Sequence, residues 1–112
     1  MNANDRTYNG WTNYETWSVN LFLTDDDVTM MVIDGHVQDA CEVAADIDEA
    51  RRKMAEVLKD MVEEANPLAD GEPSVYQQLL AGALSECDWY EVAEKFIDAE
   101  TFAAYNATEV VR

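Results

Sequence analysis

Residues 37–65 read VQDACEVAADIDEARRKMAEVLKDMVEEA, and this stretch decides the fold class. We expect one long central helix from about Val37 to Ala65, because apolar side chains recur along it at three- and four-residue steps. The helix should end before Pro67, since a residue that precedes a proline is disfavoured in the helical conformation. Residues 66–73 then form a loop. The apolar positions on the buried face are Cys41, Ala44, Ile47, Met54, Leu58, Met61 and Ala65.

The segments before this stretch are predicted to form two shorter helices. A capping-box pattern, T-x-x-E, at residues 12–15 begins a helix over about 13–23. The sequence TDDD at residues 24–27 favours a second helix start, because acids in a first turn complement the positive end of the helix dipole. This helix covers about 25–34 and is ended by the glycine that follows it. The β-branched residues within 28–33 leave a strand there as the alternative.

The segments after the central stretch also carry helix-start signals. The pattern S-x-x-Q at residues 74–77 opens a helix that runs through Leu84. The pattern D-x-x-E at residues 88–91 caps a last amphipathic helix, and a final turn near 101–105 packs back on it.

Length and composition favour a single compact all-α domain over residues 1–112, built from five or six helices. A chain of 112 residues and 12.6 kDa has no room for a second core. Its apolar content of 48% is enough to drive folding. Residues 1–11 are expected to be an N-terminal arm and residues 106–112 a frayed tail.

The expected core joins apolar side chains from all these helices. Cys41 and Cys87 lack CxxC spacing and histidine neighbours, so we expect reduced core thiols rather than a disulfide or a metal site. The aromatic residues of the arm and first helix follow three-residue steps. We expect them to fasten the arm to the core, with a recognition surface as the alternative; they are Tyr8, Trp11, Tyr14 and Trp17. The side chains expected to be buried together are Trp17, Leu21, Ile47, Met54, Leu58, Leu80, Leu84, Trp89 and Phe96.

The hydropathy pattern contains no membrane or export signal. No apolar run approaches the roughly 20 residues that span a bilayer. The N-terminal sequence MNANDRTYNG lacks the basic and then apolar order of a signal peptide. We therefore expect a soluble, cytoplasmic protein.

The charge balance is the strongest functional signal in the sequence. Twenty-four Asp and Glu residues and seven Lys and Arg residues give a net charge of −17, with a sequence pI near 4.1. Such a field repels nucleic acid and anionic lipid, and it attracts basic surfaces over a Debye length of about 8–10 Å. We expect no direct nucleic-acid binding and no membrane binding, and a basic protein as the partner.

The acids are also unevenly distributed. No basic residue lies between Arg6 and Arg51, where there are ten acids, and none lies between Lys59 and Lys95, where there are nine. In the predicted central helix, a carboxylate stripe is interrupted only at Lys53 and consists of Glu42, Asp46, Glu49, Glu56, Asp60 and Glu63. We expect the binding surface to contain this stripe and its neighbours, namely Asp25, Asp26, Asp27, Asp39, Glu42, Asp46, Glu49, Glu56, Asp60, Glu63 and Glu64.

The spacing of these acids suggests two explanations. Acids at three- and four-residue steps lie about 5 Å apart along a helix, a distance comparable to phosphate spacing in nucleic acid. Like charges at this spacing cost a few tenths of a kcal/mol each, so a solvated face normally mixes signs. The excess therefore indicates either mimicry of a phosphate backbone or adaptation to high salt. Twelve Asp and twelve Glu residues with only three Lys residues are typical of salt adaptation.

The sequence offers no set of residues that supports catalysis, and we expect the protein not to be an enzyme. His36 is the single histidine and has no partner at metal-ligand spacing. The aspartates at residues 25–27 have carboxylates suited to Mg²⁺ or Ca²⁺, but EF-hand spacing is absent and helix capping explains them. No serine lies in a GxSxG context, and no glycine-rich phosphate loop is present. We expect no cofactor and no bound metal.

Two parts of the sequence resemble a family of small acidic proteins found in phages, plasmids and their bacterial hosts. The segment YNGWTNYETW at residues 8–17 looks like the N-terminal signature of that family, whose Asn-Tyr-Glu-Thr-Trp core begins the first helix. The stretches NPLA at 66–69, ALSE at 83–86 and DWYE at 88–91 are similar to its C-terminal half. The resemblance covers about half of the chain, and residues 25–64 depart from it most. It implies a mobile-element context and no catalytic residue.

This context leads to the main functional hypothesis. Mobile elements make small acidic proteins that resemble DNA in charge and block host defence enzymes, including restriction and CRISPR effectors. The resemblance therefore implies a DNA-mimic inhibitor that occupies a basic DNA- or PAM-reading surface in the host cytoplasm. The alternative is a non-catalytic interaction protein of a salt-adapted organism, whose acids serve hydration only. The sequence predicts no oligomeric state.

Overall fold

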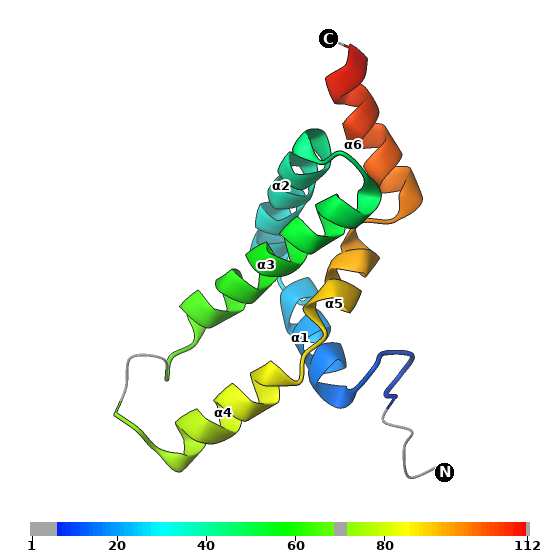
Figure 1. The fold of residues 1–112 in the computed structure, drawn as a ribbon. Coiled ribbons are helices and arrows are strands. Elements are labelled where there is room, and N and C mark those ends of the chain that lie inside the picture. The colour runs from blue at the N-terminus through cyan, green and yellow to red at the C-terminus, as the bar shows by residue number, and fades with distance from the viewer. Residues whose placement is uncertain (1–6, 69–71, 112) are drawn as a thin grey trace.

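The computed structural model describes residues 7–68 and 72–111, and this part of the chain is all α-helical. The described residues form six helices and no strand, arranged as in Figure 1. An isolated bridge between Tyr8 and Trp11 closes a tight turn ahead of the first helix. The expected class, a single compact all-α domain of five or six helices, is confirmed. The first six residues of the predicted arm lie outside the described residues.

Helix α1 (Tyr14–Thr24) and helix α2 (Asp27–Val43) begin one or two residues later than the sequence patterns suggested. Asn13, not Thr12, caps α1, because its side-chain oxygen accepts a hydrogen bond from the Thr16 backbone N–H at 2.9 Å. Asp26 caps α2 in the same way, accepting from the Thr29 N–H at 2.9 Å. Thr24 is the last residue of α1 instead of a cap.

The predicted boundary between the second and third helices is wrong. Gly35 lies inside α2, and the strand alternative for residues 28–33 is also wrong, because α2 is continuous from Asp27 to Val43. The break falls instead at Ala44, whose ψ of 145° takes the backbone out of the helix. A glycine in a helix costs only about 1 kcal/mol relative to alanine, which is too little to stop α2.

A capping box explains why helix α3 (Ile47–Ala65) starts anew after this break. The Asp46 carboxylate accepts from the Glu49 N–H at 2.8 Å, and the Glu49 carboxylate accepts from the Ala45 N–H at 2.9 Å. This reciprocal pair satisfies two backbone donors that a continuous helix would have bonded internally. The single helix predicted over residues 37–65 is therefore two helices.

The C-terminal half follows the predicted starts but not the predicted end. Helix α4 (Val75–Ser85) is capped by Ser74, and helix α5 (Trp89–Phe96) is capped by Asp88, as expected. Helix α6 (Ala99–Val111) is a full helix where only a turn was predicted. It includes residues 106–111 of the expected frayed tail, and residue 112 lies outside the described residues. Asn106 donates to the Cys41 carbonyl at 3.0 Å.

The core lies between α1, α2, α3 and α5. Its largest fully buried side chains include Leu23, Ile33, Met54, Leu58 and Ile97. Of the nine residues expected in the core, Met54 and Leu58 are fully buried, whereas Leu21 is 50% exposed and that expectation is wrong. The remaining six are half-buried, and four of them pack against the core, namely Ile47, Leu84, Trp89 and Phe96. The other two are Trp17 and Leu80.

A buried threonine explains the different orientation of α1. The Thr16 hydroxyl is fully buried, accepts from the Asp88 backbone N–H at 2.9 Å and donates to the Asn13 side chain at 2.6 Å. This contact turns the face with Thr16, Val19 and Leu23 toward the core. The aromatic face, which the sequence predicted to be buried, is left at the surface.

The arm that precedes α1 folds onto this aromatic face. The Tyr8 ring lies 5.1 Å from the Tyr14 ring and 4.8 Å from the Trp17 ring, centroid to centroid. Trp11 packs against the core, and the Lys95 ammonium lies 5.4 Å from its ring centroid. The expected fastening of the arm is therefore observed, although Tyr8 and Tyr14 stay partly exposed.

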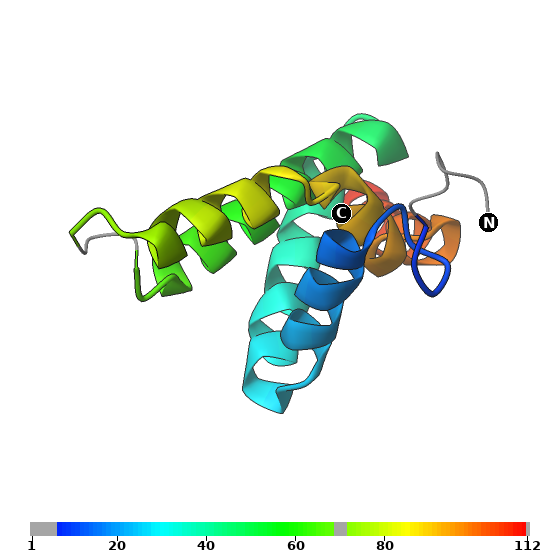
Figure 2. The ribbon, with the colours of Figure 1, turned by 90° about the horizontal axis from the view of Figure 1, so that it is seen from below.

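Helix α4 stands apart from the rest of the fold. Figure 1 shows the C-terminal half of α3 and helix α4 projecting as an open hairpin, at the end of the molecule away from α6. Seen from below in Figure 2, this hairpin meets the pair α1 and α2 at a wide angle. No residue of α4 is buried.

Candidate functional site

The eleven acids expected to form the binding surface lie on the turn between α1 and α2, on α2 and on α3. Nine of them are exposed, and Glu42 and Glu49 are half-buried. They do not form one continuous stripe on one helix, because the break at Ala44 separates Glu42 from the acids of α3. The predicted stripe is corrected on this point.

Two of these acids hold the starts of helices. Asp26 and Asp46 are the N-caps of α2 and α3, and each carboxylate accepts a backbone N–H of its own helix. The N–H and hydroxyl of Thr29 donate to Asp26 and hold the pKa of its carboxyl below the ordinary value. Both residues therefore have a structural explanation that needs no partner.

Two more predicted acids make contacts within the chain. Glu49 completes the capping box with the Ala45 N–H, and Glu42 accepts from the side-chain amide of Gln38 at 3.1 Å. Seven acids are left exposed, and the structure gives their side chains no hydrogen bond or ion pair within the described ranges 7–68 and 72–111. They are Asp25, Asp27, Asp39, Glu56, Asp60, Glu63 and Glu64.

The densest group among these seven lies near the C-terminal end of α3. We call Asp60, Glu63 and Glu64 the α3 acidic cluster. Glu63 and Glu64 follow Asp60 by three and four residues, so both lie beside it on one side of the helix. Leu58 is fully buried on the opposite face. The last turn of α3 contains no basic residue. The negative end of the helix dipole therefore adds to the repulsion among the three carboxylates.

The basic residues of α3 compensate this charge only in part. Arg51 turns inward, where it donates to the Ile97 carbonyl at 2.9 Å and lies 3.6 Å from Glu94. Arg52 pairs with Asp48 at 3.0 Å. Lys53 and Lys59 are exposed, and helical spacing places Lys59 beside the acidic face. The face is thus less free of basic residues than the sequence pattern suggested.

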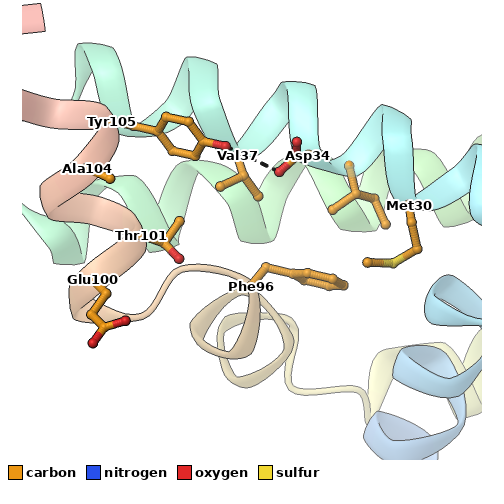
Figure 3. A pocket seen from close by; sticks show the side chains of 9 residues that line it. Met30, Asp34, Val37, Phe96, Glu100, Thr101, Ala104 and Tyr105 are labelled. Carbon is orange, nitrogen blue, oxygen red and sulfur yellow. Dashed lines mark hydrogen bonds between the residues drawn. The ribbon is translucent and has the colours of Figure 1, made fainter. Parts of the chain in front are cut away.

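A pocket of about 400 Å³ lies between α2 and α6, with the end of α5 beneath it (Figure 3). The Tyr105 hydroxyl donates to Asp34 at 3.4 Å across its upper side. The negative charge of Asp34 raises the pKa of the Tyr105 phenol, and burial adds to the effect. Asp34 and Glu100 give the pocket a negative rim over an apolar floor, and neither was among the predicted site residues. The other lining residues are Met30, Ile33, Val37, Phe96, Thr101 and Ala104.

A second cavity, of about 390 Å³, is an apolar groove between α1 and α4, with the end of α3 as its floor. We define the apolar groove by Tyr14, Ser18 and Phe22 of α1, Val62 of α3, and Leu80 and Ala83 of α4. The sequence pattern did not predict this groove. The available signal was α4 itself, VYQQLLAGALS, which is the one helix of the described chain without a charged residue.

The described residues offer no arrangement for metal or thiol chemistry. No group of three or more His, Cys, Asp or Glu side chains within 7–68 and 72–111 is placed to hold a metal ion. His36 follows Gly35, where the second helix was expected to end, and it lies within α2 instead. Cys41 and Cys87 are buried and unbonded, as expected. Burial raises the pKa of both thiols, that of Cys87 to about 11, which disfavours the reactive thiolate.

None of the helices described is long and apolar enough to cross a membrane.

Comparison with known proteins gives a family but no activity. The chain belongs to DUF7249, a family of unknown function, whose model matches residues 4–107. No curated protein and no solved structure matches the chain.

Proposed function

We propose that this protein is a non-catalytic, acidic DNA-mimic inhibitor made by a phage or other mobile element. It binds a basic DNA- or PAM-reading surface of a host defence complex, either a CRISPR effector or a restriction enzyme, in the host cytoplasm. By occupying this surface it prevents the complex from binding its target duplex. The protein itself binds neither nucleic acid nor membrane, since its charge of −17 repels both.

The observation that carries this proposal is the position of the α3 acidic cluster. Three carboxylates stand together near the negative end of a helix whose last turn has no base, and the one base beside them is Lys59, four residues before Glu63. Both like-charge repulsion and the helix dipole disfavour this arrangement in the isolated protein. A basic partner removes both costs at once, because its cations neutralise the carboxylates on binding.

The geometry of the cluster also fits a phosphate-binding surface. Helical rise places carboxylates at three- and four-residue steps about 5 Å apart, so that side chains evolved to contact successive phosphates can contact them instead. Glu56, one turn earlier on α3, extends the same face. Of the five basic residues among the described ranges, Arg51, Arg52 and Lys95 are engaged within the protein and do not neutralise this face.

The test is a mobility-shift assay with a panel of purified CRISPR effector complexes and restriction enzymes, each with its own target duplex. A mimic added before the duplex should block the shift, whereas the same amount added after the duplex should not, because the site is then filled and dissociates slowly. Inhibition should also weaken as salt rises. Equal inhibition in both orders of addition would contradict DNA-site mimicry.

Matched variants assign the effect to the cluster. Replacement of Asp60, Glu63 and Glu64 by Asn, Gln and Gln should weaken inhibition on the order of tenfold or more. Replacement of Glu72, Glu86 and Glu100 by Gln removes the same charge from exposed positions on other segments and should have a much smaller effect. If the two triple variants lose the same inhibition, the cluster has no special role and only total charge matters.

One observation favours the second candidate, an interaction protein of a salt-adapted organism. Exposed acids also lie outside the cluster, on the loop before α4, after α4 and on α5 and α6: Glu72, Glu86, Glu94 and Glu100. For such a protein, thermal stability should keep rising into molar KCl, and no effector in the panel should be inhibited. For the proposed inhibitor, stability should level off once the charges are screened, at a Debye length of a few ångströms.

A further inference from the structure

The apolar groove between α1 and α4 is bordered by large side chains that the fold leaves in solvent. Phe22, which lines the groove, is 63% exposed. On α4, Tyr76 is 71% exposed and Leu79 is 65% exposed, and each lies one helical turn before a lining residue, Leu80 or Ala83. Tyr14 also lines the groove, and Leu21 extends its α1 side because it lies one turn after Ser18. The groove and its rim therefore form one continuous apolar surface.

Stability of the monomer does not explain this surface. No side chain of α4 is fully buried, and of its residues only Leu84 packs against the core, so the helix contributes little to it. A large side chain has an area of about 150–250 Å², so the five exposed residues Tyr14, Leu21, Phe22, Tyr76 and Leu79 present on the order of 600 Å². That area lies at the upper limit for the largest patch of an ordinary monomer.

The electrostatics of this surface separate it from the acidic surface. Helix α4 has no charged residue, and Glu15 is the one charged residue that lines the groove. In a chain in which 28% of residues are charged, the groove is thus a nearly uncharged part of the surface. A basic partner finds too few carboxylates there to bind, whereas a second copy of the chain meets the least like-charge repulsion there.

We propose that this surface is the interface of a homodimer, in which the α1–α4 face of one copy packs on the same face of a second copy. A two-fold contact requires a self-complementary patch, and this one combines a groove of about 390 Å³ with protruding side chains on its rim. The exposed rim residues, with the groove floor and backbone, approach the roughly 800 Å² per partner of a stable interface. Tyr76 and Phe22 are the anchors expected to fill the groove of the other copy. The dimer is independent of the proposed inhibitor function.

Salt distinguishes this interface from the acidic one. Each copy carries −17, so screening favours self-association through a neutral patch, whereas it weakens binding to a basic partner. The two proposals therefore predict salt effects of opposite sign, and either one can fail without the other.

The test is sedimentation equilibrium of the full chain from low micromolar to sub-millimolar protein, at about 0.05 M and about 0.5 M NaCl, which shortens the Debye length severalfold. We expect the mass to rise from 12.6 kDa toward twice that value, with tighter association at the higher salt. A monomer at every concentration and both salt levels would overturn the proposal. So would a dimer that dissociates as salt is raised, because its interface would then be an ionic one.

Variants place the interface on the molecule. Phe22→Asp and Leu79→Asp should each weaken association about tenfold or more, as hot-spot substitutions do. Tyr76→Ala should weaken it without adding charge. Val43→Asp is the matched control, since Val43 is 69% exposed at the end of α2 far from α4 (Figure 1), and it should leave association unchanged apart from the added charge.

Circular dichroism shows whether each variant keeps its helices. If an aspartate variant loses them, the association of Tyr76→Ala tests the location of the interface. Retained dimerisation in all three groove variants would overturn the proposed location. An equal loss in Val43→Asp would also overturn it, because the effect would then come from charge alone.

Discussion

The end of helix α3 separates two surfaces of opposite chemistry. On one side, Asp60, Glu63 and Glu64 form a charged cluster in solvent; on the other, Val62 and Ala65 line the apolar groove beneath α4. The acidic side costs the monomer stability through repulsion, and the apolar side costs it solubility through exposed hydrocarbon. Neither feature is explained by the folding of a single chain, which is why we propose a binding role for each.

The acidic cluster and the apolar groove also respond differently to the same conditions. Salt screens the cluster and weakens its attraction to a basic partner, whereas it favours contact between two neutral grooves. Temperature acts on the groove mainly through the hydrophobic effect. Substitutions in the core, on α4 and among the surface acids therefore test whether the acidic cluster and the apolar groove are independent of each other.

The largest expected effect comes from replacing a buried core leucine and an exposed α4 leucine beside the groove in the same way. Leu58→Ala removes a fully buried side chain and should lower the free energy of unfolding by about 2–5 kcal/mol. Leu79→Ala, at 65% exposure, should change it by less than about 0.5 kcal/mol in dilute protein. Urea unfolding followed by circular dichroism measures both. A large loss for Leu79→Ala would mean that α4 packs into the core and that the groove is closed.

A smaller effect is expected at Cys87, in the link between α4 and α5. Burial raises the pKa of this thiol to about 11 from an ordinary value near 9, so the thiolate fraction at pH 8 falls about a hundredfold. The native protein should therefore react with a thiol reagent on the order of a hundredfold more slowly than the unfolded chain. Fast reaction without unfolding would show that α4 swings away from the core, and the groove would then have no fixed wall.

The same thiol sets a direction for the dependence of stability on pH. Because folding raises the pKa of Cys87, burial of the neutral thiol stabilises the fold fully below pH 9. This stabilisation is lost as the pH rises toward 11. The phenols of Tyr90 and Tyr105, whose pKa values are raised by Asp48 and Asp34, act in the same direction at alkaline pH. The unfolding temperature of Cys87→Ala should fall less steeply over this range than that of the native chain.

Sequence patterns predicted much of this fold because helix starts are local. The caps at Ser74 and Asp88 involve side chains and backbone donors three residues apart, so the sequence contains all the information. The break at Ala44 is also local, but Asp46 and Glu49 were assigned to a charged stripe instead of a capping box. The same two acids supported two interpretations, and a contact with the backbone decided between them.

The surface regions were harder to predict because they depend on distant contacts. The orientation of α1 depends on a hydrogen bond between Thr16 and Asp88, which are 72 residues apart in sequence. That contact buries Val19 and Leu23 and leaves Leu21 and Phe22 in solvent, and Phe22 belongs to the α1 wall of the groove. Periodicity alone gave the wrong face, since α1 is apolar on several sides. The excess of acids was visible in the sequence, but which acids have partners was not.

The smallest expected effect concerns two acids of α3, Asp60 and Glu56. Neutralising one should raise the free energy of unfolding, and neutralising the other should lower it. Asp60 has like charges at three- and four-residue steps, at Glu56, Glu63 and Glu64, and no base at such a step. Glu56 has instead three bases at these steps and one acid, and the bases are Arg52, Lys53 and Lys59. Both side chains are exposed on the same helix, so their surroundings differ mainly in the charge of their neighbours.

Removing each charge separately therefore gives opposite results. Asp60→Asn should raise the free energy of unfolding by a few tenths of a kcal/mol, because it relieves repulsion and lies toward the negative end of the helix dipole. Glu56→Gln should lower it by a similar amount, because it loses favourable pairs. Asn and Gln match Asp and Glu closely in helix propensity, so propensity contributes little to either result. Urea unfolding at low salt resolves the signs, and both differences should vanish in molar salt as the charges are screened. If Asp60→Asn instead destabilises the isolated protein, the fold itself stabilises the cluster. Its carboxylates would then carry no repulsive cost for a basic partner to relieve.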